Sequence, residues 1–228
     1  MTALTDLPAL FRYQAALLIR SHRLLPPLLL YVLIMGIGVQ AGQPILDSFG
    51  WAGVALLLVA AWFVRICVTN EPPAARHVAA AATSPARVHL ASVLTALTCS
   101  VALGAIGTAF VAIVSDPRSS DRQIDVPVGP ATLAGLLTAL ACALLGTAVG
   151  ALCNRPLLRG TGWTMLLTMV VAMLVLVVDG SPAHAAVTGL VTGSASGRVT
   201  IPLLPLAATA VLAAMATAVA CALSSRRE

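Results

Sequence analysis

The residues that could carry out chemistry are few, and their types exclude several kinds of active site. The chain of 228 residues has 13 basic side chains, 8 acidic side chains, 4 histidines and 5 cysteines, and every basic residue is an arginine. Without a lysine, it has neither the P-loop that binds ATP nor the amine that Schiff-base catalysis needs. The sequence also lacks paired aspartates, a histidine-metal cluster or an activated serine at a position suited to catalysis within a membrane. We therefore expect that this chain is not an enzyme.

Outside the apolar runs, the segment 70–87 has the clearest pattern of a defined structure. Two prolines after Glu71 interrupt an apolar run, and the alanine-rich stretch 74–82 favours a helix. Ser84 then supplies an N-cap, and Pro85 follows at the first helical position. The pattern predicts a short helix and a new helix start, although an ordinary hairpin between two spans would explain it as well. The charged side chains of the segment are Glu71, Arg76 and Arg87.

The overall composition indicates that these residues belong to a membrane protein. Hydrophobic residues make up 59% of the chain and charged residues 9%, and the mean hydropathy is +0.99, whereas soluble domains carry roughly 25% charged residues. The sequence predicts an all-α polytopic membrane protein in which 24–228 forms one six-helix transmembrane domain. The predicted spans, each near the length that a bilayer core requires, are 24–39, 51–69, 88–114, 130–153, 163–178 and 201–223.

The arginines predict how these spans are oriented. Successive loops between the predicted spans lie on alternate sides of the membrane. This alternation places three arginines on one side, Arg118, Arg122 and Arg198. The larger set on the other side is Arg12, Arg20, Arg23, Arg76, Arg87, Arg155, Arg159, Arg226 and Arg227. Because cytoplasmic loops carry the excess of basic residues, we expect both termini and the 70–87 loop in the cytoplasm. The net charge of +5 does not indicate nucleic-acid binding, since no basic stripe with interleaved aromatic residues is present.

Residues 1–23 are predicted to form an amphipathic interfacial helix. At about 100° per residue, leucine and phenylalanine side chains gather on one arc, and Arg12, Arg20 and Arg23 gather on the opposite arc. Such a helix lies in the membrane interface with its arginines facing anionic headgroups or a partner. The apolar run 24–39 also resembles a secretory signal that would be cleaved near Ala41, but the segment before it is unusually long for a signal peptide.

Residues within the spans predict packing rather than catalysis. Gly146 and Gly150 have the spacing that lets two helix backbones approach closely. Serines and threonines of the third and fourth spans could line a polar path, but hydrogen bonds to their own helix carbonyls are favoured. Arg65 and Asp179 are predicted at span ends, which disfavours an ion-coupled transporter because such proteins need ionisable groups deep in the membrane. The segment 180–200 is predicted as an outer loop, with one or two helical turns within 182–190 and a flexible run at 193–197.

The cysteines and histidines do not predict a metal site. The cysteines show no Cys-x-x-Cys spacing and lie in or beside spans, where a free thiol behaves as a small hydrophobe. The histidines fall on both sides of the predicted membrane and cannot form one ligand cluster; they are His22, His77, His89 and His184.

Taken together, these features resemble the membrane subunit of an ABC-2 type transporter, the permease class that works with a separate ATPase. The segment 4–23 looks like the interfacial helix that begins members of this family, and 71–87 looks like the coupling helix between their second and third spans. The restart at Ser84, Pro85 and Arg87 is similar to the family's proline-centred exit from that helix. The alanine run and the Pro72-Pro73 pair depart from the family, whose members usually carry Gly-Thr and more leucine there.

The resemblance implies a permease that exports an apolar or amphipathic small molecule or peptide by alternating access across the cytoplasmic membrane. Its partners would be an ABC ATPase subunit, which binds ATP and magnesium, a second copy or paralogous permease, and the lipid bilayer. This chain itself would hold no cofactor. The residues implied at the contact with the ATPase are Glu71, Arg76, Ser84, Pro85 and Arg87. Two alternatives stay open: a membrane component like the haem exporter of cytochrome c maturation, and a membrane scaffold or assembly protein that transports nothing.

Overall fold

The computed structural model describes residues 3–154 and 161–227, with side chains over 7–154 and 164–225. Arg155, Arg159 and the side chains of Arg226 and Arg227, which enter the charge pattern above, lie outside the described parts. The named elements are helices: α1 (Ala3–Arg20), a short 3-10 turn (His22–Leu24), α2 (Leu25–Gly38), α3 (Ile45–Asn70), α4 (Pro73–Ala82), α5 (Pro85–Val114), α6 (Val128–Cys153), α7 (Thr161–Val177), α8 (Pro182–Ser196) and α9 (Leu203–Arg227).

The helices confirm an all-α polytopic membrane protein with 4 to 6 candidate spans. Four helices, α3, α5, α6 and α9, are long and apolar enough to cross a membrane. Two more crossings arise if each bent helix pair is one span: α1 with α2, bent by 78°, and α7 with α8, bent by 51°. With 14 residues, α2 is about 21 Å long and cannot cross a hydrocarbon core of about 30 Å unaided.

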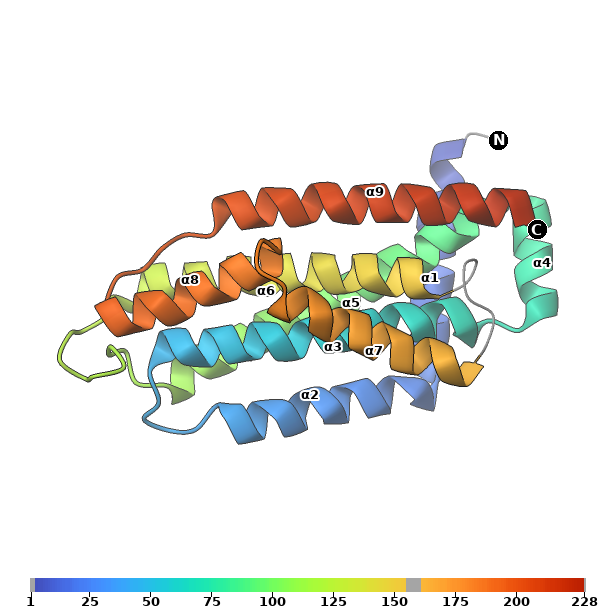
Figure 1. Ribbon diagram of the computed structural model, residues 1–228. Coiled ribbons are helices and arrows are strands. Elements are labelled where there is room, and N and C mark those ends of the chain that lie inside the picture. Colours follow the sequence, from blue (N-terminus) through green and yellow to red (C-terminus); the bar gives the residue numbers. More distant parts are fainter. Residues whose placement is uncertain (1–2, 155–160, 228) are drawn as a thin grey trace.

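The long helices lie side by side, while α1 and α4 lie across them at one end of the bundle (Figure 1). The last turn of α9 lies at this end too, and the loops 39–44 and 115–127 lie at the opposite end. We call these the α4 end and the loop end. Because α1 is turned by 78° from α2, it has the orientation that an interfacial helix needs.

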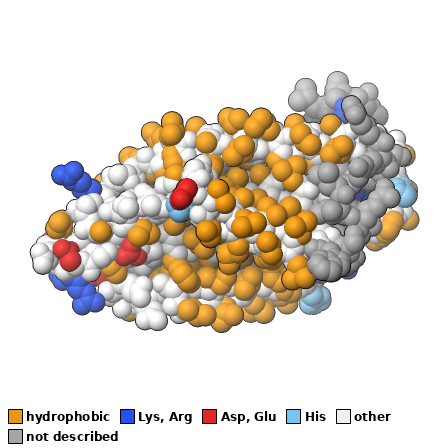
Figure 2. Space-filling model, viewed as in Figure 1, with side chains coloured by type: hydrophobic (Ala, Val, Ile, Leu, Met, Phe, Trp, Pro, Cys, Tyr) orange, Lys and Arg blue, Asp and Glu red, His pale blue; other side chains and the backbone are white. Residues whose placement is uncertain are grey.

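The centre of the bundle is formed by α3 and α6. Their most apolar stretches are 78% and 72% buried, whereas those of α5 and α9 are 28% and 22% buried and turn apolar side chains outward. On the face that Figure 2 shows, apolar side chains cover much of the middle of the molecule. Two glycines let α6 approach α3: a Cβ on Gly146 would lie 2.4 Å from the Leu57 carbonyl oxygen, and one on Gly150 would lie 2.7 Å from Cβ of Val64.

Most of the span hydroxyl groups bond to their own helices, as the sequence predicts. Thr95, Ser100 and Thr108 of α5 and Thr147 of α6 each donate to the carbonyl four residues earlier, over 2.7 to 2.8 Å. Thr138 differs, because its buried hydroxyl has no hydrogen-bond partner within the described chain. The bonded hydroxyls are engaged locally and do not form a polar path.

The segment after α7 corrects the sequence prediction. Where the sequence indicates a loop with a few helical turns, α8 is a helix of 15 residues. The run 193–197, predicted as flexible, forms the last turn of α8 and its cap, where Gly197 adopts a φ of +65°. Glycine, serine and threonine have low helix propensities, so the periodic signal is weak. The start and stop signals are nevertheless present, since Pro182 begins the helix and Gly197 follows it.

Candidate functional site

The C-terminal turn of α3 joins the elements of the α4 end. Arg23, from the 3-10 turn, donates a hydrogen bond to the Thr69 carbonyl over 3.2 Å. Arg76, from α4, donates to the Val68 carbonyl over 3.4 Å. The last carbonyls of a helix have no partners within the helix and carry partial negative charge. The two arginines therefore stabilise the end of α3 while attaching the turn and α4 to it.

The same end of α3 also holds α1. The Asn70 side chain donates to the Leu17 carbonyl over 3.2 Å, and the Gln14 side chain donates to Oε2 of Glu71 over 3.0 Å. Gln14 is 2% exposed and Glu71 is 8% exposed, so this bond is shielded from water and competes little with it. We call Gln14, Arg23, Asn70, Glu71 and Arg76 the α3 junction.

The predicted coupling residues therefore do not all face outward. Glu71 and Arg76 are each 8% exposed and point into the α3 junction. The Ser84 hydroxyl accepts a hydrogen bond from the Arg87 backbone over 3.3 Å, and Pro85 is the first residue of α5. The predicted N-cap and helix restart are thus confirmed, and the Arg87 side chain is partly exposed. In this arrangement, Arg76 attaches α4 to α3 and Glu71 attaches α1 to the same end of α3, and neither residue presents its charge at the surface.

One side of α4 is exposed at the end of the molecule. Successive residues of a helix are about 100° apart, so the exposed residues share one face and the packed ones the other. On the packed side, Ala79 and Ala80 contact a cluster that includes Leu10 of α1 and Val88 of α5. Val78, 71% exposed, is a large apolar side chain on a helix that lies across the spans. We call the exposed residues, Ala74, His77, Val78, Ala81 and Ala82, the α4 outer face.

Two further side chains lie beside the α3 junction. His89, in the second turn of α5, is 1% exposed, and neither of its ring nitrogens has a hydrogen-bond partner within the described chain. Tyr13, on α1, is near Glu71: partial burial of its phenol and then the Glu71 charge raise the pKa of Tyr13. The junction therefore affects the titration of a neighbouring side chain on α1.

The arginines of the predicted interfacial helix are at the surface. Arg12, Arg20 and Arg23 are exposed, whereas Leu10 and Leu18 are 9% and 1% exposed. The exposed arginines and the buried leucines face different sides of the segment 10–23. An anionic headgroup or a partner could therefore reach the basic side.

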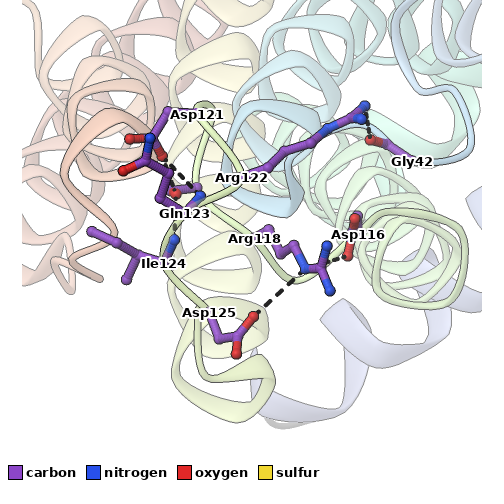
Figure 3. Close-up of polar contacts among 9 residues, drawn as sticks. Gly42, Asp116, Arg118, Asp121, Arg122, Gln123, Ile124 and Asp125 are labelled. Carbon is purple, nitrogen blue, oxygen red and sulfur yellow. Dashed lines mark hydrogen bonds and ion pairs between the residues drawn. The ribbon is translucent and has the colours of Figure 1, made fainter.

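The loop end has charges too, but they are held in an exposed loop (Figure 3). The Arg118 guanidinium lies 3.9 Å from Asp116 and 3.6 Å from Asp125, and the Asp125 side chain is 92% exposed. Arg122 donates to the Gly42 carbonyl over 3.4 Å, which ties this loop to the one before α3. Exposed ion pairs contribute about 1 kcal/mol or less, so these contacts shape the loop without forming an enclosed site.

Within this loop, the carboxylate of Asp121 is the one whose pKa is lowered by hydrogen bonds. Its carboxylate accepts a hydrogen bond from the Ser119 hydroxyl and a second, over 3.2 Å, from the Gln123 backbone. The Ser119 bond first, and then the Gln123 bond, lower the pKa of Asp121. These bonds keep the turn of the loop closed when the carboxylate is ionised.

Sequence reasoning misses one polar pair. The sequence predicts Asp179 at the end of a span, and the residue follows the end of α7, at the break before α8. Its fully exposed carboxylate is 3.4 Å from Nε2 of His184, in the first turn of α8. The turn sequence from Asp179 to Pro182 is the signal that could have revealed it, because proline after a turn often starts a helix.

Within the described residues, no group of three or more histidine, cysteine or acidic side chains is placed to hold a metal ion. The five cysteines are free thiols. No known protein family, curated protein or solved structure matches the chain. The α3 junction with the α4 outer face is thus the candidate site on which a function can be argued.

Proposed function

We propose that the chain is the permease subunit of an ATP-driven ABC-2 type transporter in the cytoplasmic membrane, with both termini in the cytoplasm. A second permease subunit completes the path, and a separate ATPase subunit binds ATP and magnesium. The cargo is an apolar or amphipathic small molecule or peptide, exported by alternating access. The observation that carries the proposal is α4, which lies across the bundle end with one side attached to α3 and the other exposed.

A push on α4 has a short route into the bundle. Arg76 links α4 to the last turn of α3, and α6 packs tightly on α3 at Gly146 and Gly150, which lie against Leu57, Ala60 and Val64. Dense interiors transmit displacement because they have little free volume. Movement of α4 would therefore shift the two central helices together, which is what a permease needs in order to open and close its path.

The ATPase can drive this movement only if it binds one conformation of the permease better than the other. The α4 outer face is suited to that contact, because Val78 is apolar and 71% exposed and His77 beside it can donate or accept hydrogen bonds. Arg76 acts indirectly, since it holds α4 against α3 at the angle at which the partner meets it, and Glu71 holds α1 at the same end.

The test is affinity purification of the tagged chain in mild detergent, with mass spectrometry and an ATP hydrolysis assay on the recovered complex. A nucleotide-binding subunit in about one-to-one ratio is expected with the wild-type chain. Val78→Glu is expected to lower its recovery and the hydrolysis about tenfold or more, because a charge replaces an apolar contact worth about 1.5 kcal/mol or more. Gln123→Glu adds the same charge at the loop end, where Gln123 is exposed, and is expected to change neither.

Recovery of the wild-type chain without a nucleotide-binding subunit contradicts the proposal. Equal recovery with Val78→Glu and wild type would retain a transporter but reject the α4 outer face as the contact. Arg76→Leu separates direct from indirect roles: if Arg76 only positions α4, the subunit still binds, but ATP hydrolysis no longer responds to cargo.

A further inference from the structure

The turn between α1 and α2 presents positive charge without a counter-charge. Arg20 ends α1 and Arg23 lies in the 3-10 turn, and both side chains are exposed. Neither has an ion-pair partner among the side chains that the structure describes. Glu71, the acidic side chain described at this end, is 8% exposed and accepts the hydrogen bond from Gln14. An anion from outside the chain can therefore reach two cationic groups at this turn.

The two guanidinium groups are suited to a phosphate. Nη1 of Arg23 donates to the Thr69 carbonyl over 3.2 Å, which occupies one of the five N–H groups and holds the side chain at the end of α3. The other N–H groups form the planar fork that matches two oxygens of a phosphate. Arg20 has no hydrogen-bond partner within the described chain, so its side chain can turn toward the same anion.

An apolar surface begins at the same turn. The opposite side of α2 packs into the core through Tyr31 and Met35, and α2 lies at one edge of the bundle, next to α3 (Figure 1). The large side chains on its other side are 52% to 66% exposed and recur every three or four residues, which places them on one helix face. We call these residues, Leu25, Leu29, Val32, Leu33 and Ile37, the α2 outer face.

The length of α2 places this turn at the depth of lipid headgroups. With 14 residues, α2 is about 21 Å long, which is less than a hydrocarbon core of about 30 Å. The bilayer adapts to a short apolar segment by thinning, or the flanking basic side chains reach to the interface. Because α1 lies across the bundle end while α2 runs along the spans (Figure 1), Arg20 and Arg23 lie where the chain enters the apolar region. A lipid offers both a phosphate for the arginines and a hydrocarbon chain for the α2 outer face.

We propose that the turn between α1 and α2 binds an anionic phospholipid, with its phosphate at Arg20 and Arg23 and one acyl chain along the α2 outer face. Charge complementarity selects the anionic class, because a zwitterionic lipid brings its own cationic group to a turn that already has two. The bound lipid anchors a helix that is too short to cross the membrane unaided, and it keeps α1 at the interface. This binding is separate from transport, since it needs neither ATP nor a protein partner.

Trp51 provides a reporter for the site. Its Nε1 donates to the Ile34 carbonyl of α2 over 2.9 Å, and the side chain is 42% exposed. Ile34 is nine residues after Leu25, the first residue of α2, and so lies about 14 Å along the helix. This is close to half of a hydrocarbon core of about 30 Å, the depth that the end of an acyl chain reaches. Bromine quenches indole fluorescence at close range, so a lipid brominated toward its chain ends quenches Trp51 when it occupies the α2 outer face.

The test uses the full chain with Trp62→Phe and Trp163→Phe, which leaves Trp51 as the one of three tryptophans. The protein is reconstituted in vesicles of phosphatidylglycerol and phosphatidylcholine, with one lipid brominated at a time. Quenching of Trp51 is expected to show a preference for phosphatidylglycerol of at least about fivefold. Arg20→Gln is expected to lower this preference about threefold, and Arg20→Lys to keep most of it, because lysine keeps the charge.

Two controls separate the site from the rest of the surface. Arg118→Gln removes a partly exposed arginine at the loop end and is expected to leave the preference unchanged. The second control moves the reporter to α9, at the opposite edge of the bundle from α2 (Figure 1), by Trp51→Phe with Val211→Trp. Val211 is 58% exposed, so both brominated lipids are expected to quench the new tryptophan without preference.

Arg20 carries the test because its side chain makes no bond within the described chain, so its replacement leaves the turn intact. Equal quenching by the two lipids, or a preference that Arg20→Gln leaves unchanged, overturns the proposal. Arg12→Gln distinguishes a site from general attraction, since Arg12 lies eight residues before Arg20 on α1, about 12 Å away along the helix. A loss with Arg12→Gln as large as with Arg20→Gln also overturns the proposal, because the attraction would then belong to the whole basic helix.

Discussion

Both bent helix pairs turn sharply between two helices, but the side chains at the two turns make different contacts. Near the first turn, between α1 and α2, the polar side chains of the α3 junction are bonded to one another, to α1 or to α3, and Gln14 and Glu71 are buried. At the second turn, between α7 and α8, the Asp179 carboxylate is fully exposed. The first turn is thus fixed by buried hydrogen bonds, whereas the second is held by a more exposed pair, His184 and Asp179.

This difference separates two reasons for putting polar residues in an apolar bundle. A buried polar group that is bonded costs little and specifies one arrangement, and its loss leaves the buried partner unsatisfied, whereas an exposed group can bond to other polar partners. Substitutions at the first turn should therefore lower stability more than substitutions at the second turn.

The largest effect on stability is expected at Glu71. Glu71→Ala leaves the buried Gln14 amide without its acceptor, which costs about 1 to 3 kcal/mol. Glu71→Gln should cost less, because an amide oxygen still accepts that bond and the second carboxylate oxygen has no partner within the described chain. Thermal unfolding in detergent, followed by the fluorescence of the three tryptophans, measures both. Asp125→Ala is the control and should stay within about 0.5 kcal/mol of wild type; equal losses at Glu71 and Asp125 would contradict a fixed first turn.

A smaller effect is expected at Asn70, which holds α1 through one hydrogen bond to the Leu17 carbonyl. Asn70→Ala should lower the stability by about 0.5 to 1.5 kcal/mol. Because the bond joins α1 to α3, its loss should also speed trypsin cleavage after Arg20, which lies at the end of α1. An unchanged cleavage rate would mean that the other contacts of the α3 junction hold α1 without Asn70.

The second turn should tolerate substitution better. His184→Ala removes the bond to the Leu176 carbonyl and the contact with Asp179, but both groups lie where other polar partners can reach them. The expected loss is about 1 kcal/mol or less, below that of Glu71→Ala in the same unfolding assay. A loss as large as at Glu71 would show that the second turn is also fixed by its side chains.

The sequence predicts the long elements well because their signals are strong. Unbroken apolar runs and the Ser84-Pro85 start depend on local residues alone, and the corresponding helices and N-cap are present. The back-bonded hydroxyls of α5 are predictable for the same reason, since a serine or threonine within a helix has a carbonyl of its own helix in reach.

The two turns are harder to predict because their contacts join residues far apart in the chain. Gln14 and Glu71 are 57 positions apart, and a sequence pattern does not reveal whether such side chains meet. The charge of Glu71 and Arg76 suggests surface contact residues, but Glu71 meets Gln14 of α1 and Arg76 meets the last turn of α3, and each is 8% exposed. At the second turn, the glycine, serine and threonine of α8 conceal a helix, so the sequence does not predict that a second helix follows Asp179 directly.

The smallest effect is expected in the titration of Tyr13, and it reports directly on the first turn. Burial, followed by the Glu71 charge, raises the pKa of Tyr13, so the folded chain keeps this proton to higher pH than the unfolded chain does. The contribution of Tyr13 to the free energy of unfolding is therefore constant below the ordinary tyrosine pKa of about 10 and falls as the pH rises above it.

The titration of Tyr13 can be followed alone. The chain has two tyrosines, so Tyr31→Phe leaves Tyr13 as the one that titrates in the ultraviolet spectrum. Adding Glu71→Gln should move its pKa down toward about 10, with burial still holding it somewhat higher, whereas adding Asp125→Asn should not move it. If Glu71→Gln leaves the titration unchanged, Tyr13 and Glu71 are not held close together, and α1 is attached more loosely than the α3 junction implies.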